Sequence, residues 1–134
     1  MLPDLRLPLT TTLIVAAALA TRDFQDVHHD RTAAQAKGVP DIFMNILTTT
    51  GLVQRYVTDW AGPDAVVRAV SIRLGRPNFP GDTMTLTGTV TGRADENGLP
   101  VWSVAVRGAN RIGDHVTGTV RLAWPEDAPP DGPR

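Results

Sequence analysis

The chain has 134 residues, of which 42% are hydrophobic and 20% are charged, and its formal net charge at pH 7 is −1. This length fits a single domain with one core. The nearly neutral charge offers no basic surface to a phosphate backbone, which argues against a nucleic-acid partner. Cysteine is absent, so disulfides and thiolate chemistry are excluded, and the composition fits a reducing compartment.

The apolar run Leu13–Ala20 is the first element that the pattern indicates. It is shorter than the roughly 20 apolar residues that a membrane-spanning helix needs. Asp4 offsets Arg6 where a signal peptide would be basic. We therefore expect a short buried helix or strand capped by Thr10–Thr12, no membrane partner, and a cytoplasmic protein. Residues 1–12, with two prolines, are expected to form an arm that is either irregular or an edge strand.

A polar cluster follows at residues 23–30, where three carboxylates and two of the three histidines lie within eight residues. Such a cluster is poorly suited to a core and too concentrated for an idle surface loop. We interpret Asp23 and His28 as a pair that activates water. Loop capping and surface polarity are the alternatives that these residue types leave open.

The other polar residues of this segment have simpler interpretations. His29 should point away from its neighbour His28. Asp30 is suited to be the N-cap of a short helix over Arg31–Lys37, which Gly38 ends. His28, His29 and Asp30 are metal-ligand types, but adjacent histidines seldom converge on one ion. We therefore predict no metal site.

The longest helix is predicted over Asp41–Trp60, because apolar residues recur there at helical spacing. The stripe covers much of the helix circumference, so the helix should be largely enclosed. Ala61-Gly62-Pro63 ends it. The stripe consists of Phe43, Ile46, Leu47, Leu52, Val53, Tyr56, Val57 and Trp60.

The rest of the chain has the period-two pattern of strands. Four runs, at Val66–Leu74, Thr83–Thr91, Val101–Val106 and Val116–Trp124, predict an antiparallel meander with one buried face. In the first run Arg68 interrupts the alternation. The links 92–98 and 109–114 contain the Gly, Asn and Asp residues that hairpins require.

This order of elements indicates an α+β hot-dog fold, in which an antiparallel sheet wraps around the long central helix. An exposed sheet edge and the small size favour pairing with a second hot-dog domain. We expect an arm at residues 1–12, the hot-dog domain at residues 13–124, and a disordered tail at residues 125–134, which has four prolines.

Three motifs in this order resemble the MaoC-like (R)-specific enoyl-CoA hydratases. Arg22–Asp30 is similar to the family signature Gly-Asp-x-Asn-Pro-(aliphatic)-His, with Asp23 and His28 five residues apart as the catalytic pair of the family is. Pro77–Thr83 resembles Pro-x-x-Pro-Gly-Asp-Thr, and Asn110–Gly113 resembles the motif before the last strand. The resemblance implies that Asp23 and His28 are catalytic.

A closer resemblance links Ala20–Asp30, Asp41–Phe43 and Gly51–Pro63 to the small subunit of actinobacterial steroid side-chain hydratases. In that group two different MaoC-like chains pair, and the small subunit carries the Asp/His pair. The resemblance implies a heteromer with a second MaoC-like hydratase subunit, and a steroid side-chain enoyl-CoA as substrate in cholesterol degradation. An acyl-CoA aldolase is a possible further partner.

The sequence departs from the family pattern at two places. Arg22 stands where the signature has Gly, and Gln25-Asp26 stands where it has Asn-Pro. The family commonly has Ile-Ala-His-Gly-Met near the start of the long helix, where this chain has Ile42–Ile46. The resemblance therefore implies that the Asn45 backbone N–H, with Met44 beside it, replaces the glycine amide that binds the thioester oxygen.

Hydration of an unsaturated thioester requires a base for water, a proton for the α-carbon, and stabilisation of the carbonyl oxygen. Asp23 suits the base, and His28 can orient the water and relay the proton. Backbone N–H groups at the long helix's N-terminus can stabilise the oxygen. No cofactor is expected, since coenzyme A is part of the substrate. A thioesterase on the same fold and a scaffold subunit without catalysis are the alternatives.

Overall fold

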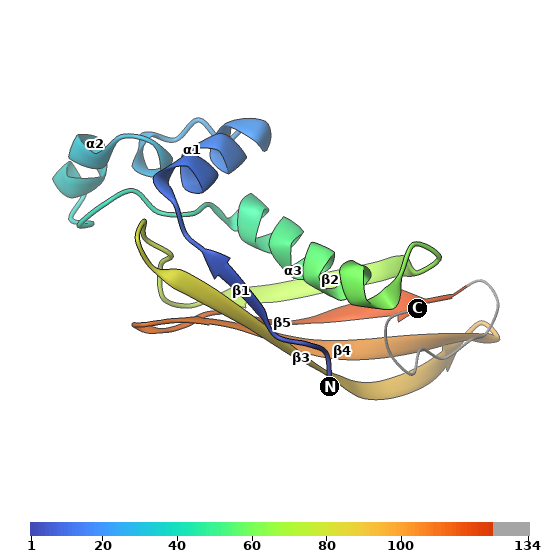
Figure 1. The fold of residues 1–134 in the computed structure, drawn as a ribbon. Coiled ribbons are helices and arrows are strands. Elements are labelled where there is room, and N and C mark those ends of the chain that lie inside the picture. Colours follow the sequence, from blue (N-terminus) through green and yellow to red (C-terminus); the bar gives the residue numbers. More distant parts are fainter. Residues whose placement is uncertain (125–134) are drawn as a thin grey trace.

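The computed structural model describes residues 1–124 as one antiparallel sheet curled around a long helix, with two shorter helices at one end (Figure 1). The tail expected at residues 125–134 lies outside the described residues. The elements are β1 (Leu5–Pro8), α1 (Thr11–Ala20), the 3-10 helix η1 (Asp26–His28), α2 (Arg31–Ala36), α3 (Ile46–Ala61), β2 (Val66–Leu74), β3 (Thr83–Glu96), β4 (Leu99–Asn110) and β5 (Gly113–Ala123).

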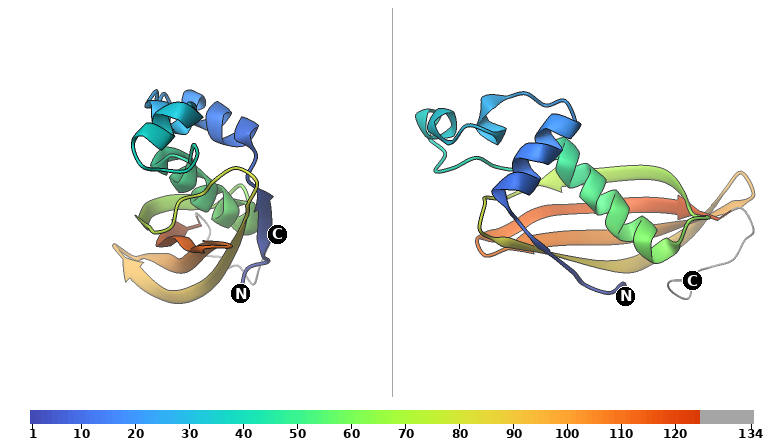
Figure 2. Two further views of the ribbon diagram at one scale, coloured as in Figure 1. Left: turned by 90° about the vertical axis from the view of Figure 1, so that its left-hand side faces the viewer. Right: turned by 45° about the horizontal axis from the view of Figure 1, so that its top comes forward.

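The predicted α+β hot-dog fold is confirmed, but the predicted meander is wrong in its strand order. The order in the sheet is β1-β3-β4-β5-β2, so β2 pairs with β5 and does not lie beside β3. Residues 75–82 connect β2 to β3 across the end of the sheet (Figure 2). Period-two patterning identifies the buried face of each strand but does not identify its neighbours, which is why the pattern did not reveal this crossover.

The hairpin strands are longer than predicted. Strand β3 continues to Glu96 and β4 begins at Leu99, so the link predicted over residues 92–98 shrinks to Asn97 and Gly98. Both of these residues have positive φ angles, 53° and 80°, as a type I′ hairpin turn requires. Charged residues beyond the core concealed the pairing, because the ends of these strands have no buried face.

The irregular alternation in β2 has a structural cause. The register of β2 against β5 shifts between Val67 and Ala69, which marks a β-bulge at Arg68. The extra residue turns Val66 outward, where it is 48% exposed, while Val67 packs against the core.

The N-terminal arm contributes the short strand β1 to the sheet. The alternative of an edge strand is confirmed, since within residues 1–124 β1 has β3 as its one neighbour, with Leu5 opposite Leu86. Leu2 and Leu9 on either side of β1 are buried. Of the two alternatives at Leu13–Ala20, helix or strand, the helix is confirmed; it begins at Thr11, with the Thr10 hydroxyl as its N-cap.

Helix α3 begins five residues later than predicted, at Ile46 rather than Asp41. The Asn45 side chain accepts a hydrogen bond from the Thr48 N–H at 3.3 Å, which makes Asn45 the N-cap. An apolar stripe continues on the N-terminal side of this cap, and the stripe alone does not mark where a helix starts.

The prediction of an enclosed helix is also wrong: α3 buries one face against the sheet (Figure 2), while Ile46 and Leu47 are each 51% exposed.

Gly118 of β5 is the basis of a stability prediction. A Cβ atom at this position would lie 2.4 Å from the Ser71 carbonyl oxygen of β2. We expect Gly118→Ala to lower the free energy of unfolding by about 1–3 kcal/mol, because the two paired backbones must separate. Thermal unfolding measures this loss. Gly92→Ala is the matched control, since a Cβ atom there meets no atom within 4 Å in the described chain; equal melting temperatures for the two variants would contradict the prediction.

Candidate active site at the start of helix α3

Asp23 is positioned by the C-terminal end of α1. The Arg22 N–H donates to the Leu19 carbonyl at 3.0 Å, and the Asp23 N–H donates to the Ala18 carbonyl at 2.9 Å. This pair of bonds is a Schellman motif, which requires a residue in the left-handed conformation after the helix cap. Arg22 adopts it with φ 60°. An arginine therefore makes, at this position, a left-handed turn that usually favours glycine.

His28 is positioned by the 3-10 helix η1 and by the segment before α3. It is 6% exposed, and its Nδ1 lies 2.7 Å from the Phe43 carbonyl oxygen. A carbonyl only accepts, so Nδ1 carries the proton and Nε2 of the neutral ring has a free lone pair. The Phe43 ring packs edge-on against the imidazole, with centroids 4.9 Å apart.

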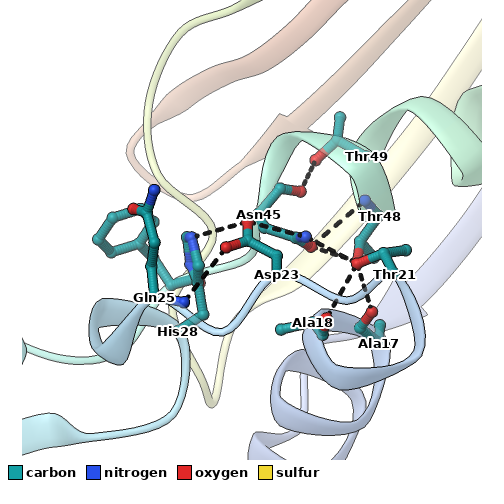
Figure 3. A network of polar contacts seen from close by, with 10 residues as sticks. Ala17, Ala18, Thr21, Asp23, Gln25, His28, Asn45, Thr48 and Thr49 are labelled. Carbon is teal, nitrogen blue, oxygen red and sulfur yellow. Dashed lines mark hydrogen bonds and ion pairs between the residues drawn. The ribbon is translucent and has the colours of Figure 1, made fainter.

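The two predicted residues converge. His28 Nε2 lies 3.4 Å from Asp23 Oδ2, and Figure 3 shows both side chains pointing toward each other beside the start of α3. The Gln25 N–H donates to Asp23 Oδ1 at 3.3 Å. With Nδ1 protonated, Asp23 Oδ2 and His28 Nε2 are both acceptors, so one water molecule could donate one hydrogen to each of them.

The pair lies in a pocket of about 330 Å³ at the N-terminus of α3. The Met44 N–H donates to the Asn78 carbonyl at 3.1 Å, so Met44 is part of the wall but its amide is already occupied. The Asn45 N–H has no acceptor within residues 1–124. The lining residues are Asp23, Gln25, His28, Phe43, Met44, Asn45, Ile46, Leu74, Gly75, Arg76, Pro77 and His115.

Two functional features of this pocket were not apparent from the sequence. The Asn45 side chain donates to Asp23 Oδ2 at 3.2 Å, whereas only its backbone was expected to matter. His115, expected to be a sheet residue, is in β5 but also lines the pocket, and its Nε2 lies 2.8 Å from Thr49 Oγ1. Sequence separations of 22 and 66 residues for these two contacts explain why local patterns gave no signal.

The remaining predictions for this segment can be compared with the structure. Asp30 is the N-cap of α2, since its carboxylate accepts from the Ala33 N–H at 3.1 Å, and this prediction is confirmed. His29 is exposed and does not line the pocket. Within residues 1–124 no group of three or more potential ligands is arranged to hold a metal ion, and no helix is long and apolar enough to cross a membrane.

Burial of His115 leads to a prediction about pH. Burial lowers the pKa of His115 below its ordinary value of 6.5, while the hydrogen bond to the Arg76 carbonyl acts in the opposite direction. Below about pH 6.5 the unfolded chain takes up a proton at this ring that the folded chain resists, so stability falls as the pH falls. We expect the melting temperature to drop more for the wild type than for His115→Gln between about pH 7.5 and pH 5.5. Equal drops would contradict this prediction.

This fold and site define a hot-dog domain of the MaoC-like class, and comparison with known proteins agrees. The MaoC like domain family matches residues 2–107. The 3-oxo-4,17-pregnadiene-20-carboxyl-CoA hydratase beta subunit of Mycobacterium tuberculosis is 58% identical over 122 residues, which are 91% of this chain and 92% of that protein. The chain therefore belongs to the MaoC-like family.

Solved structures also resemble this chain. The crystal structure of the ChsH1-ChsH2 complex from M. tuberculosis contains a chain with a TM-score of 0.86 and 55% identity, covering 92% of this chain and 94% of that one. The (R)-hydratase from A. caviae, involved in PHA biosynthesis, has a TM-score of 0.80 at 21% identity, covering 92% and 93% of the two chains. The second likeness concerns the fold alone.

Proposed function

We propose that this chain is the catalytic subunit of a cytoplasmic hydratase that adds water across the α,β double bond of a steroid side-chain enoyl-CoA. The approach of Asp23 Oδ2 to His28 Nε2, 3.4 Å apart in the pocket, is the observation that carries this proposal. The 58% identity to a steroid-carboxyl-CoA hydratase subunit supports the substrate class. The proposed reaction requires no cofactor, because coenzyme A enters as part of the substrate.

The proposed reaction begins with a water molecule that donates one hydrogen to Asp23 and the other to His28. Asp23 removes a proton as the water oxygen bonds to the β-carbon, and negative charge moves to the thioester oxygen. The Asn45 N–H, at the positive end of α3, stabilises this oxygen. The proton taken from water then passes by way of the Asp23–His28 pair to the α-carbon, so that one water is added and nothing is released.

Apolar side chains around the pocket support a partner subunit as the missing wall. Ile46 and Leu74 line the pocket while 51% and 39% exposed, and Phe24, next to Asp23 in the chain, is 64% exposed. Exposed apolar groups clustered at a polar site are typical of an interface. A second MaoC-like chain is the proposed occupant, as the crystallised complex of the M. tuberculosis relative suggests. An acyl-CoA aldolase that acts on the product is a further proposed associate.

The test is co-expression with a second MaoC-like chain, followed by assays on steroid and straight-chain enoyl-CoA thioesters. Loss of the enoyl absorbance, with a mass gain of one water and no free thiol, is the expected result for the steroid substrate. Release of free coenzyme A without hydration would instead indicate a thioesterase. Failure of the two chains to co-purify would contradict the proposed partner.

A further inference from the structure

We propose that the Asn45 side chain is a positioning residue that fixes the direction of the Asp23 carboxylate and ties it to the first turn of α3. This inference rests on the proposed function, since it concerns the same carboxylate. It adds a role for the side-chain amide, which is separate from the backbone N–H that the proposed function assigns to the substrate oxygen.

The Asn45 amide connects the turn at the end of α1 with the first turn of α3. Its Nδ2 donates to Thr21 Oγ1 at 2.9 Å and to Asp23 Oδ2 at 3.2 Å. Its Oδ1 accepts from the N–H and from the hydroxyl of Thr48. Asn45 is 1% exposed, and Figure 3 shows it between the end of α1 and the start of α3. Both hydrogens and the oxygen of the amide are therefore used.

The orientation of this amide follows from its partners. The Thr48 N–H can only donate, so the amide oxygen must face α3 and the NH₂ group must face Asp23. The Thr21 hydroxyl donates to the Ala17 carbonyl at 2.8 Å, which leaves its oxygen free to accept from the amide. Every group in this network has one consistent role.

The amide is the side chain that fits both duties. An N-cap needs an acceptor, which Asn, Asp and Ser all provide. The position beside Asp23 needs a donor, which Asn provides, whereas Asp would place a second carboxylate against the first. Ser carries an acceptor for the helix, but it is too short to reach the carboxylate as well.

Asp23 is consequently held at both of its oxygens. The Gln25 N–H binds Oδ1, and the Asn45 amide binds Oδ2, which is also the oxygen that faces His28. Two donors on different oxygens restrict rotation of the carboxylate group. Because reactive groups must be aligned closely for proton transfer, loss of one donor should reduce turnover more than it reduces substrate binding.

The experiment compares Asn45→Ser, Asn45→Asp and Asn45→Ala in the complete hydratase complex, with kcat, KM and melting temperature measured for each. Asn45→Ser retains the helix cap and should melt above Asn45→Ala, whereas Asn45→Asp retains the cap but places a second buried carboxylate against Asp23 and should also melt lower than the wild type. We expect kcat to fall by roughly 10- to 100-fold for Ser and further for Asp, with KM changed less than about threefold. The loss of kcat across these variants would then not be explained by their melting temperatures.

Thr10→Ala is the matched control, because Thr10 is the exposed N-cap of α1 and does not line the pocket. It should lower the melting temperature but leave kcat unchanged. Wild-type kcat in Asn45→Ser and Asn45→Asp would overturn the inference and reduce Asn45 to a helix cap. If the Asn45 inference is overturned in this way while Asp23→Asn abolishes hydration in the same preparation, the proposed function still holds. If Asp23→Asn retains hydration, the proposed function and this inference both fail.

Discussion

Replacing Asp23 with Asn is expected to lower kcat for hydration by about 10²- to 10⁴-fold, because the amide cannot take a proton from water. The substitution is nearly isosteric, and an amide oxygen can still accept the Gln25 N–H that now binds Oδ1. The NH₂ group that replaces Oδ2 cannot accept from the Asn45 amide, so one hydrogen bond is lost. The melting temperature should therefore fall modestly, and the binding of the partner subunit should change little. Steady-state kinetics of the purified complex, combined with thermal unfolding, measure both effects.

Asp26→Asn provides the matched control for this variant. Asp26 lies three residues further along the same segment and pairs with Lys37 at 2.9 Å outside the pocket. The Lys37 hydrogen bond lowers the pKa of Asp26, but the carboxylate faces solvent. Asp26→Asn should keep wild-type kcat. A similar loss of turnover in both variants would indicate that the charge of the segment matters and that Asp23 is not a specific base.

Replacing His28 has the second large expected effect. We expect His28→Asn to lower kcat by about 10²-fold or more, because the lone pair of Nε2 is lost. The Asn amide can still donate to the Phe43 carbonyl, which the Nδ1 group binds at 2.7 Å. His28→Ala should lose turnover as well, and it should also lower the free energy of unfolding by about 1–3 kcal/mol, since the buried imidazole is lost and the partly buried Phe43 carbonyl loses its donor.

The neighbouring His29 supplies the control for both His28 variants. His29 is exposed and lies outside the pocket, so His29→Ala should retain wild-type kcat and melting temperature. Kinetics and thermal unfolding on the same preparations compare the two positions. Wild-type turnover in a folded His28→Asn complex would show that Asp23 acts without the imidazole.

The approach of Asp23 to His28 could be predicted from sequence because their spacing is local. His28 is the last residue of η1, which begins three residues after Asp23, so the motif itself brings the two side chains close. The Phe43 carbonyl and the Asn45 amide, which lie outside the motif, then fix their orientation. The role of the Asn45 side chain could not be predicted in this way. It depends on where α3 starts, and the apolar stripe extends beyond that start on its N-terminal side.

For the sheet, too, the sequence predicted the local feature, which side chains are buried, but not the long-range one, the order of the strands. The alternation in β3 and β5 predicted the buried residues Met84, Leu86, Val120 and Leu122. It did so because the apolar residues of each strand lie on the face that contacts the core. Strand order depends on how residues 75–82 cross the end of the sheet, and the residue pattern of β2 does not indicate which strand it pairs with. The bulge at Arg68 appeared in the sequence only as a break in the pattern.

The left-handed conformation of Arg22 has a consequence for how related sites can be identified. A side chain in this conformation costs about 1–2 kcal/mol relative to glycine, yet the chain retains the turn that directs Asp23. In this chain the turn before Asp23 thus depends on a left-handed φ angle and does not require glycine. A search for the letters Gly-Asp would miss this site, whereas a search for a helix that ends in a left-handed residue followed by Asp would find it.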